Sequence, residues 1–118
     1  MKGVGNVQRK DISSLLLKLG VSPLHQGFDY IIECVKMVDK NKELIYSVTT
    51  RLFPEVAEKF KTTPERVGRN IRHAIQNSLG YVDDSVAAEV FGSLYSKNRG
   101  IKNSCYIGAI AEYLREGD

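Results

Sequence analysis

Apolar residues recur at helical spacing along most of the chain, and short polar or glycine-containing stretches separate the groups that they form. A first helix is expected from about Asp11 to Gly20. A second is expected from Gly27 to the polar stretch 39–42, and a third over 43–52. No segment alternates between apolar and polar positions as a half-buried strand does. The pattern therefore predicts an all-α fold.

The C-terminal third predicts two further helices. A short helix capped by Asp83 or Asp84 should end at Gly92, and a last helix should begin with Asn103 or Ser104 as its cap. With a helix pair in the middle of the chain, these segments make up a compact single-domain bundle of about six helices. A chain of 118 residues is large enough for one core and too small for two.

The middle pair has the sequence features of a helix-turn-helix at about residues 54–79. A short helix is followed by a three-residue break and a longer helix. The longer helix can start with Thr63 as its N-cap and Pro64 as its first residue, or with Thr62 as the cap and Glu65 closing a capping box. Both alternatives place its beginning within one residue.

A projection of the longer helix at 100° per residue separates a packing face from an exposed face. The packing face contains Val67, Ile71, Ala74, Ile75 and Ser78. The opposite face contains Arg66, Arg69, His73, Gln76 and Asn77, with Arg72 beside them. No acidic residue occurs from Arg66 to Leu79. Guanidinium groups suit guanine edges and phosphate oxygens, so the expected partner is anionic.

The overall composition is that of an ordinary globular chain, with 42% hydrophobic and 26% charged residues. The formal net charge is +3, and residues 51–75 alone hold six Lys or Arg against three Glu. The positive field is therefore centred on the helix pair. There is no run of about 18 apolar residues and no charged-then-apolar leader, so no membrane partner is expected and the predicted location is cytoplasmic.

The sequence contains no constellation typical of an enzyme or of a metal site. Cys34 and Cys105 lack CxxC spacing, and with His25 and His73 they match no zinc pattern. No glycine-rich phosphate loop follows a strand. We therefore expect two reduced thiols, no metal, no cofactor and no catalytic activity.

The ends of the predicted fold carry two further features. Residues 1–10 are polar, basic and glycine-containing, which indicates a flexible leader or linker remnant before a folded unit at 11–118. The loop at 96–102 contains Lys97, Arg99 and Lys102 and leads into the last helix. A basic loop at a helix N-terminus can bind phosphate, and it can equally be a solvated connector.

The string LFPEVAEKFKTTPERVGRNIRHAI over residues 52–75 resembles the centre of a known bacterial domain. It is similar to the C-terminal DNA-binding effector domain of the sporulation response regulator of endospore-forming bacteria. The similarity extends upstream through LGVSPLHQGFDY and downstream through FGSLYSKNRGIKNSCYIGAIAEYL, so it covers roughly residues 11–115. The family fold is a small all-helical domain of six helices.

The resemblance implies a sequence-specific transcription factor for sporulation-type genes whose second helix enters the DNA major groove at a short AT-flanked box with a central GC pair. Arg69 and Arg72 match the arginines that read base edges. The residues expected to support DNA binding or to contact phosphate are Arg66, His73, Gln76, Thr63, Lys97, Arg99 and Lys102. Gly68 stands where the family usually has a glutamate.

The resemblance implies that double-stranded DNA is the main partner. Its candidate further partners are the sigma subunit of RNA polymerase and a second copy bound head to tail on tandem boxes. The alternative function is a helical protein-interaction module that binds RNA polymerase or another regulator without reading DNA. Salt dependence separates these alternatives, because phosphate contacts weaken steeply as salt rises whereas an apolar protein interface does not.

Overall fold

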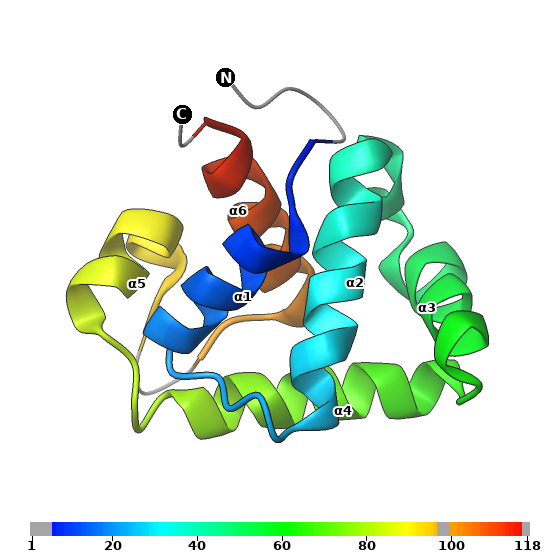
Figure 1. Cartoon of the computed structure of the whole chain (residues 1–118), viewed down its shortest axis with the longest axis horizontal. Helices are drawn as coiled ribbons and strands as arrows, with labels where there is room; N and C mark the ends of the chain where they lie inside the picture. The colour runs from blue at the N-terminus through cyan, green and yellow to red at the C-terminus, as the bar shows by residue number, and fades with distance from the viewer. Residues whose placement is uncertain (1–5, 97–99, 117–118) are drawn as a thin grey trace.

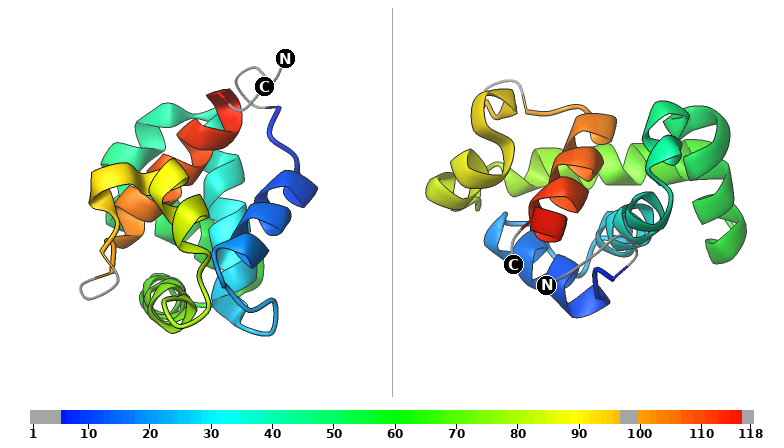
Figure 2. Two further views of the ribbon diagram at one scale, coloured as in Figure 1. Left: turned by 90° about the vertical axis from the view of Figure 1, so that its left-hand side faces the viewer. Right: turned by 90° about the horizontal axis from the view of Figure 1, so that it is seen from above.

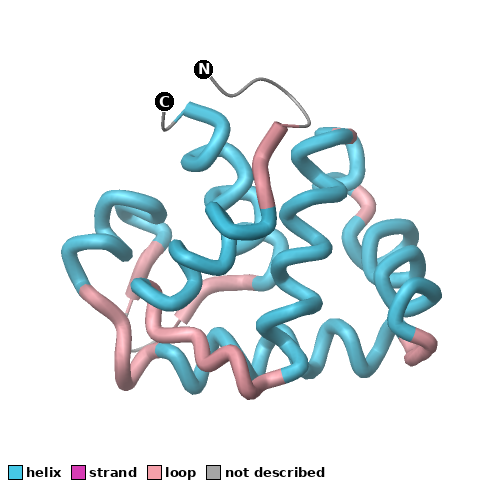
Figure 3. The backbone as a smooth tube through the Cα atoms, in the orientation of Figure 1, coloured by secondary structure: helices cyan, strands magenta, loops and turns pink. Residues whose placement is uncertain are grey.

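A computed structural model describes residues 6–96 and 100–116 of the chain. The helices are α1 (Arg9–Lys18), α2 (Gln26–Lys40), α3 (Phe53–Phe60), α4 (Pro64–Ser78), α5 (Asp84–Phe91) and α6 (Asn103–Glu116). Three short helical segments join them: η1 (Lys42–Tyr46), η2 (Val48–Leu52) and η3 (Gly92–Leu94). No strand occurs among the described residues (Figure 3). The all-α prediction with six helices is confirmed.

Helix α4 forms one side of the molecule, and the other helices are arranged above it and at its two ends (Figure 1). Helix α2 descends onto α4, while α3 and α5 lie at opposite ends of it. The largest fully buried side chains are Ile12, Leu16, Leu19, Val21, Ile31, Ile32, Val35, Leu52, Val56, Ile71, Ile107 and Ile110. Because α1, α2, α3, α4 and α6 all contribute to this list, one continuous core fixes α4 in place.

The crossing of α2 over α4 depends on a glycine. A Cβ atom at Gly27 would lie 2.4 Å from the carbonyl oxygen of Asn70 and 2.8 Å from the Cβ of Ala74. Any larger residue at this position would push the two helices apart. The glycine that was expected to open the second helix therefore also sets its distance from α4.

Asp39 is a buried charged residue that joins three parts of the fold. Its carboxylate accepts a hydrogen bond from the backbone N–H of Val7 at 3.1 Å and forms an ion pair with Arg115 of α6 at 3.2 Å. Asp39 lies in the last turn of α2, so the chain before α1 and the ends of α2 and α6 meet there. A buried charge with two partners in good geometry is strongly held in position.

Three sequence-based boundaries need correction. The expected helix over 43–52 is wrong as a single element, since Ser47 adopts φ −138° and ψ 49° and separates η1 from η2. Helix α1 begins at Arg9, two residues before the expected Asp11, and Val7 is already buried. Helix α6 includes Asn103 as its first residue, one position earlier than a cap at Asn103 would place it.

Candidate nucleic-acid interface

The turn between α3 and α4 has the geometry expected of a helix-turn-helix. Lys61 ends α3 in the left-handed conformation with φ 55°, and the N–H of Thr62 donates to the carbonyl of Ala57 at 2.9 Å. The side chain of Thr63 then accepts a hydrogen bond from the backbone N–H of Arg66 at 3.2 Å. Of the two predicted starts of the longer helix, the one with Thr63 as N-cap and Pro64 as first residue is therefore correct.

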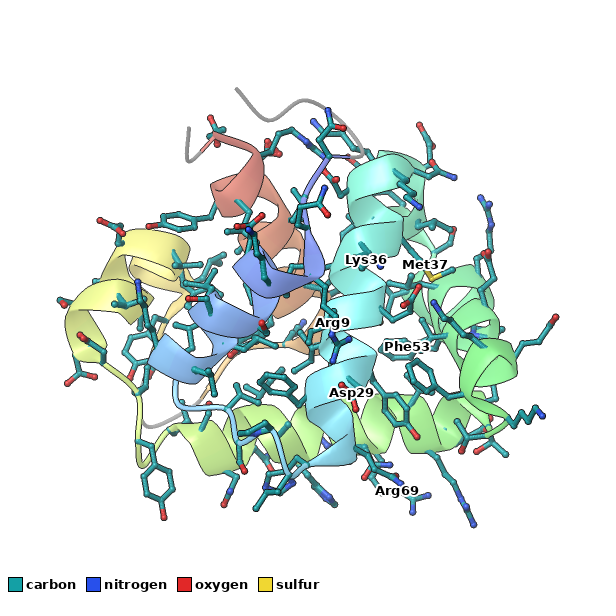
Figure 4. All side chains as sticks on the ribbon, in the orientation of Figure 1. Arg9, Asp29, Lys36, Met37, Phe53 and Arg69 are labelled. Atoms are coloured by element: carbon teal, nitrogen blue, oxygen red, sulfur yellow. The ribbon has the colours of Figure 1, made fainter. Side chains whose placement is uncertain are left out.

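The two faces of α4 are those that the periodicity predicted. All five residues of the predicted packing face are buried: Val67, Ile71, Ala74, Ile75 and Ser78. All six residues predicted to face outward are exposed: Arg66, Arg69, Arg72, His73, Gln76 and Asn77. In Figure 4, the labelled side chain of Arg69 extends below α4, away from the core. Helix α4 thus packs against the core along one face and is exposed to solvent along the other.

The three arginines of α4 have no carboxylate partner within the described part of the chain, which contains five ion pairs elsewhere. Other exposed cations are paired, such as Arg9 with Asp29 and Lys59 with Glu33, each at 2.8 Å. The side chain of Asn70 is also occupied, because its amide donates to the carbonyl of Arg66 at 2.8 Å. The arginine face is therefore free for an external anion.

A groove of about 430 Å³ runs along one flank of this face. Arg72 and Gln76 of α4 line one wall, and Lys102 with the first residues of α6 lines the other. The backbone N–H groups at a helix N-terminus that lack intrahelical partners favour an anion, and so do the two cations of the groove, Arg72 and Lys102. The structure therefore brings the predicted Lys102 beside the α4 face, while Lys97 and Arg99 lie outside the described residues.

One contact at this groove could not be predicted from the sequence pattern. The side-chain amide of Asn103 donates a hydrogen bond to the carbonyl of Gly68 at 3.0 Å, across 35 positions of the chain. Gly68 also lies against the ring of Phe53, since a Cβ atom there would be 3.1 Å from the nearest ring carbon. The first turn of α6 is thus tied to α4 next to Arg69, and the glycine permits close packing of the ring.

Among the described residues, 6–96 and 100–116, no helix is long and apolar enough to cross a membrane, and no three His, Cys, Asp or Glu side chains are grouped as metal ligands. Cys34 and Cys105 are both free thiols. Burial, reinforced by the neighbouring Glu33, raises the pKa of the Cys34 thiol, so that this group stays protonated.

A comparison with known families covers the part of the chain that contains α3, α4 and the groove. The family model described as sporulation initiation factor Spo0A C terminal matches residues 12–114, which is nearly the whole described chain and includes the complete helix-turn-helix. The family is a non-catalytic, DNA-binding effector domain of a transcription regulator. This chain therefore belongs to the family of Spo0A C-terminal domains.

Proposed function

We propose that this chain binds double-stranded DNA sequence-specifically, with α4 in the major groove, and thereby regulates transcription of sporulation-type genes. The observation that carries the proposal is the exposed face of α4, where three arginines lack carboxylate partners among the described residues. A helix of this kind fits the major groove, and an arginine fork can donate two hydrogen bonds to the O6 and N7 atoms of guanine.

The roles proposed for the individual residues are those that the family resemblance implies, and the positions of the side chains support them. Arg69, which extends away from the core, and Arg72, which borders the groove, would read base edges. The flanking side chains of Arg66, His73 and Gln76, together with Lys102 across the groove, would hold the sugar–phosphate backbone. Thr63 supports the interface by fixing the beginning of α4.

The test is a titration of labelled duplex carrying an AT-flanked box with a central GC pair, at two salt concentrations. Affinity should fall steeply with salt, with a slope of about −0.9 per phosphate neutralised. Arg69→Ala and Arg72→Ala should each cost about 1–3 kcal/mol of binding and relax the preference at one base pair. Lys102→Ala should weaken all sequences alike and reduce the salt slope by about 1.

Arg9→Ala is the matched control, because it removes the same charge from α1, where Arg9 is paired with Asp29. This variant should bind as the wild type does. Affinity that does not depend on salt would remove the DNA-binding proposal and favour the protein-interaction alternative, with RNA polymerase as the partner to test. Equal, sequence-independent losses for the arginine and lysine variants would mean that α4 does not enter the major groove of the DNA.

A further inference from the structure

A second hollow, of about 450 Å³, lies beside the C-terminal half of α4. It is formed by the loop between α1 and α2, by the end of α4 and by the turn that follows it. Its lining residues are Gly20, Ser22, Leu24, His25, Asn77 and Tyr81. No acidic residue lines it.

Two close glycine contacts hold the α1–α2 loop against α4. Gly20 has φ +86°, and a Cβ atom on it would lie 2.7 Å from the carbonyl oxygen of Ser78. Gly27 packs equally closely against Asn70 at the other end of the loop. The hollow is therefore bordered by segments that are packed directly on α4, so the backbone of its lining has a fixed position relative to that helix.

The two walls of the hollow are also joined by their side chains. The Nε2 atom of His25 lies 3.0 Å from the side-chain nitrogen of Asn77, a hydrogen-bonding contact between residues 52 positions apart. His25 is the N-cap residue of α2, and its own side chain makes no capping bond. The positive end of the α2 dipole is consequently at this edge of the hollow.

The hollow and the groove lined by Lys102 lie on opposite sides of the exposed α4 face that carries Arg69. At 100° per residue, Arg72 lies about 60° to one side of Arg69 and Asn77 about 80° to the other side. Figure 2 shows the same arrangement in its left view, where α4 is seen nearly end-on. The α1–α2 loop lies to one side of α4, and the segment leading into α6 lies to the other.

We propose that this hollow holds the sugar–phosphate backbone of the second DNA strand, opposite the strand held at the Lys102 groove. The inference rests on the proposed function, since a helix in the major groove is flanked by one backbone on each side. The Nδ1–H of His25 and the hydroxyl of Tyr81 supply hydrogen-bond donors for phosphate oxygens, since the Nε2 atom of His25 accepts from the Asn77 amide. Leu24 and the ring of Tyr81, 94% and 77% exposed, supply apolar contact to deoxyribose.

The experiment uses duplexes in which one phosphate at a time, on either strand, is replaced by a neutral methylphosphonate. Wild-type protein should lose affinity at two clusters of phosphates, one on each strand. The double variant His25→Ala, Tyr81→Phe should weaken binding to unmodified DNA by at least about ten-fold, the loss expected from even one hydrogen bond to a charged group. It should also abolish the methylphosphonate effect at one cluster only. Lys102→Ala should abolish the effect at the other cluster.

The outcomes separate this inference from the proposed function. A wild-type map with a cluster on only one strand would overturn the inference and leave α4 as the DNA-binding element. A double variant that keeps both clusters would overturn it too. If the wild type shows no loss at any phosphate, the proposed function itself fails. Tyr81→Phe alone, an exposed and conservative change, gives the same readout at smaller amplitude and guards against a folding defect in the double variant.

Discussion

Gly27→Ala should push apart α2 and α4, which cross at this glycine. The added methyl carbon would stand 2.4 Å from the carbonyl oxygen of Asn70 and 2.8 Å from the Cβ of Ala74. Heavy atoms in good van der Waals contact are about 3.5–4.0 Å apart, so the helices must move by about 1 Å. Both obstacles are backbone or Cβ atoms, which cannot rotate away as the end of a long side chain can.

The expected loss of stability follows from two opposing effects. Overpacking of this kind costs about 1–3 kcal/mol, whereas replacing glycine by alanine within a helix contributes about 0.5–1 kcal/mol of stabilisation. The free energy of unfolding should therefore fall by about 1–2 kcal/mol. For a domain of 118 residues this corresponds to a decrease in Tm of about 4–8 °C, at roughly 4 °C per kcal/mol.

Urea denaturation and a thermal scan, both followed by circular dichroism at 222 nm, measure this change. Gly80→Ala is the matched control, because a Cβ atom there would have no neighbour within 4 Å and its φ is not positive. That variant should be as stable as the wild type or more stable by about 0.4–1 kcal/mol. If Gly27→Ala and Gly80→Ala have the same stability, the close crossing of α2 and α4 does not constrain the fold and the reasoning fails.

Three further predictions concern single positions. Thr63→Ala should lower the free energy of unfolding in urea by about 1 kcal/mol and Thr63→Ser should restore most of it, and equal stability of the three proteins would contradict the capping role. Gly68→Glu should raise the ratio of affinities for cognate and single-substituted boxes, because a carboxylate accepts from the cytosine amino group once the Phe53 ring has shifted; a flat ratio in a folded variant would refute this. Hydrogen bonds from the Ser85 side chain and from backbone N–H groups lower the pKa of Asp83, so its stabilising effect is present above about pH 4 and is lost as the pH falls through the lowered pKa. The stability difference between wild type and Asp83→Asn should therefore shrink on acidification, and a difference that is constant with pH would contradict it.

The prediction of the α4 faces succeeded because periodicity alone separates the two sides of a long helix. Val67, Ile71 and Ile75 follow the helical period, and all three are buried as expected. Capping could be predicted only as alternatives, since Thr62 and Thr63 have the same chemistry and adjacent positions. The structure selects Thr63 because its side chain, one residue before Pro64, accepts the bond from the first turn of α4.

The expected helix at 43–52 failed for a tertiary reason. Leu44 and Leu52 are buried, in keeping with the helical pattern, but the chain must turn between α2 and α3 within this stretch. The side chain of Asn41 accepts a bond from the N–H of Glu43 and begins a 3-10 turn, and Ser47 then leaves helical geometry. Periodicity reports which residues are buried, and it does not report where packing forces a change of direction.

The all-helical class, the helix-turn-helix and the acid-free arginine face could be predicted from local patterns, because each depends on residues close together in the chain. Tertiary packing set the surroundings of that face. It placed Asn103 against Gly68, Lys102 beside Arg72, and the α1–α2 loop against the far end of α4. These contacts join residues tens of positions apart, and their geometry is fixed by how the shared core packs rather than by any local pattern.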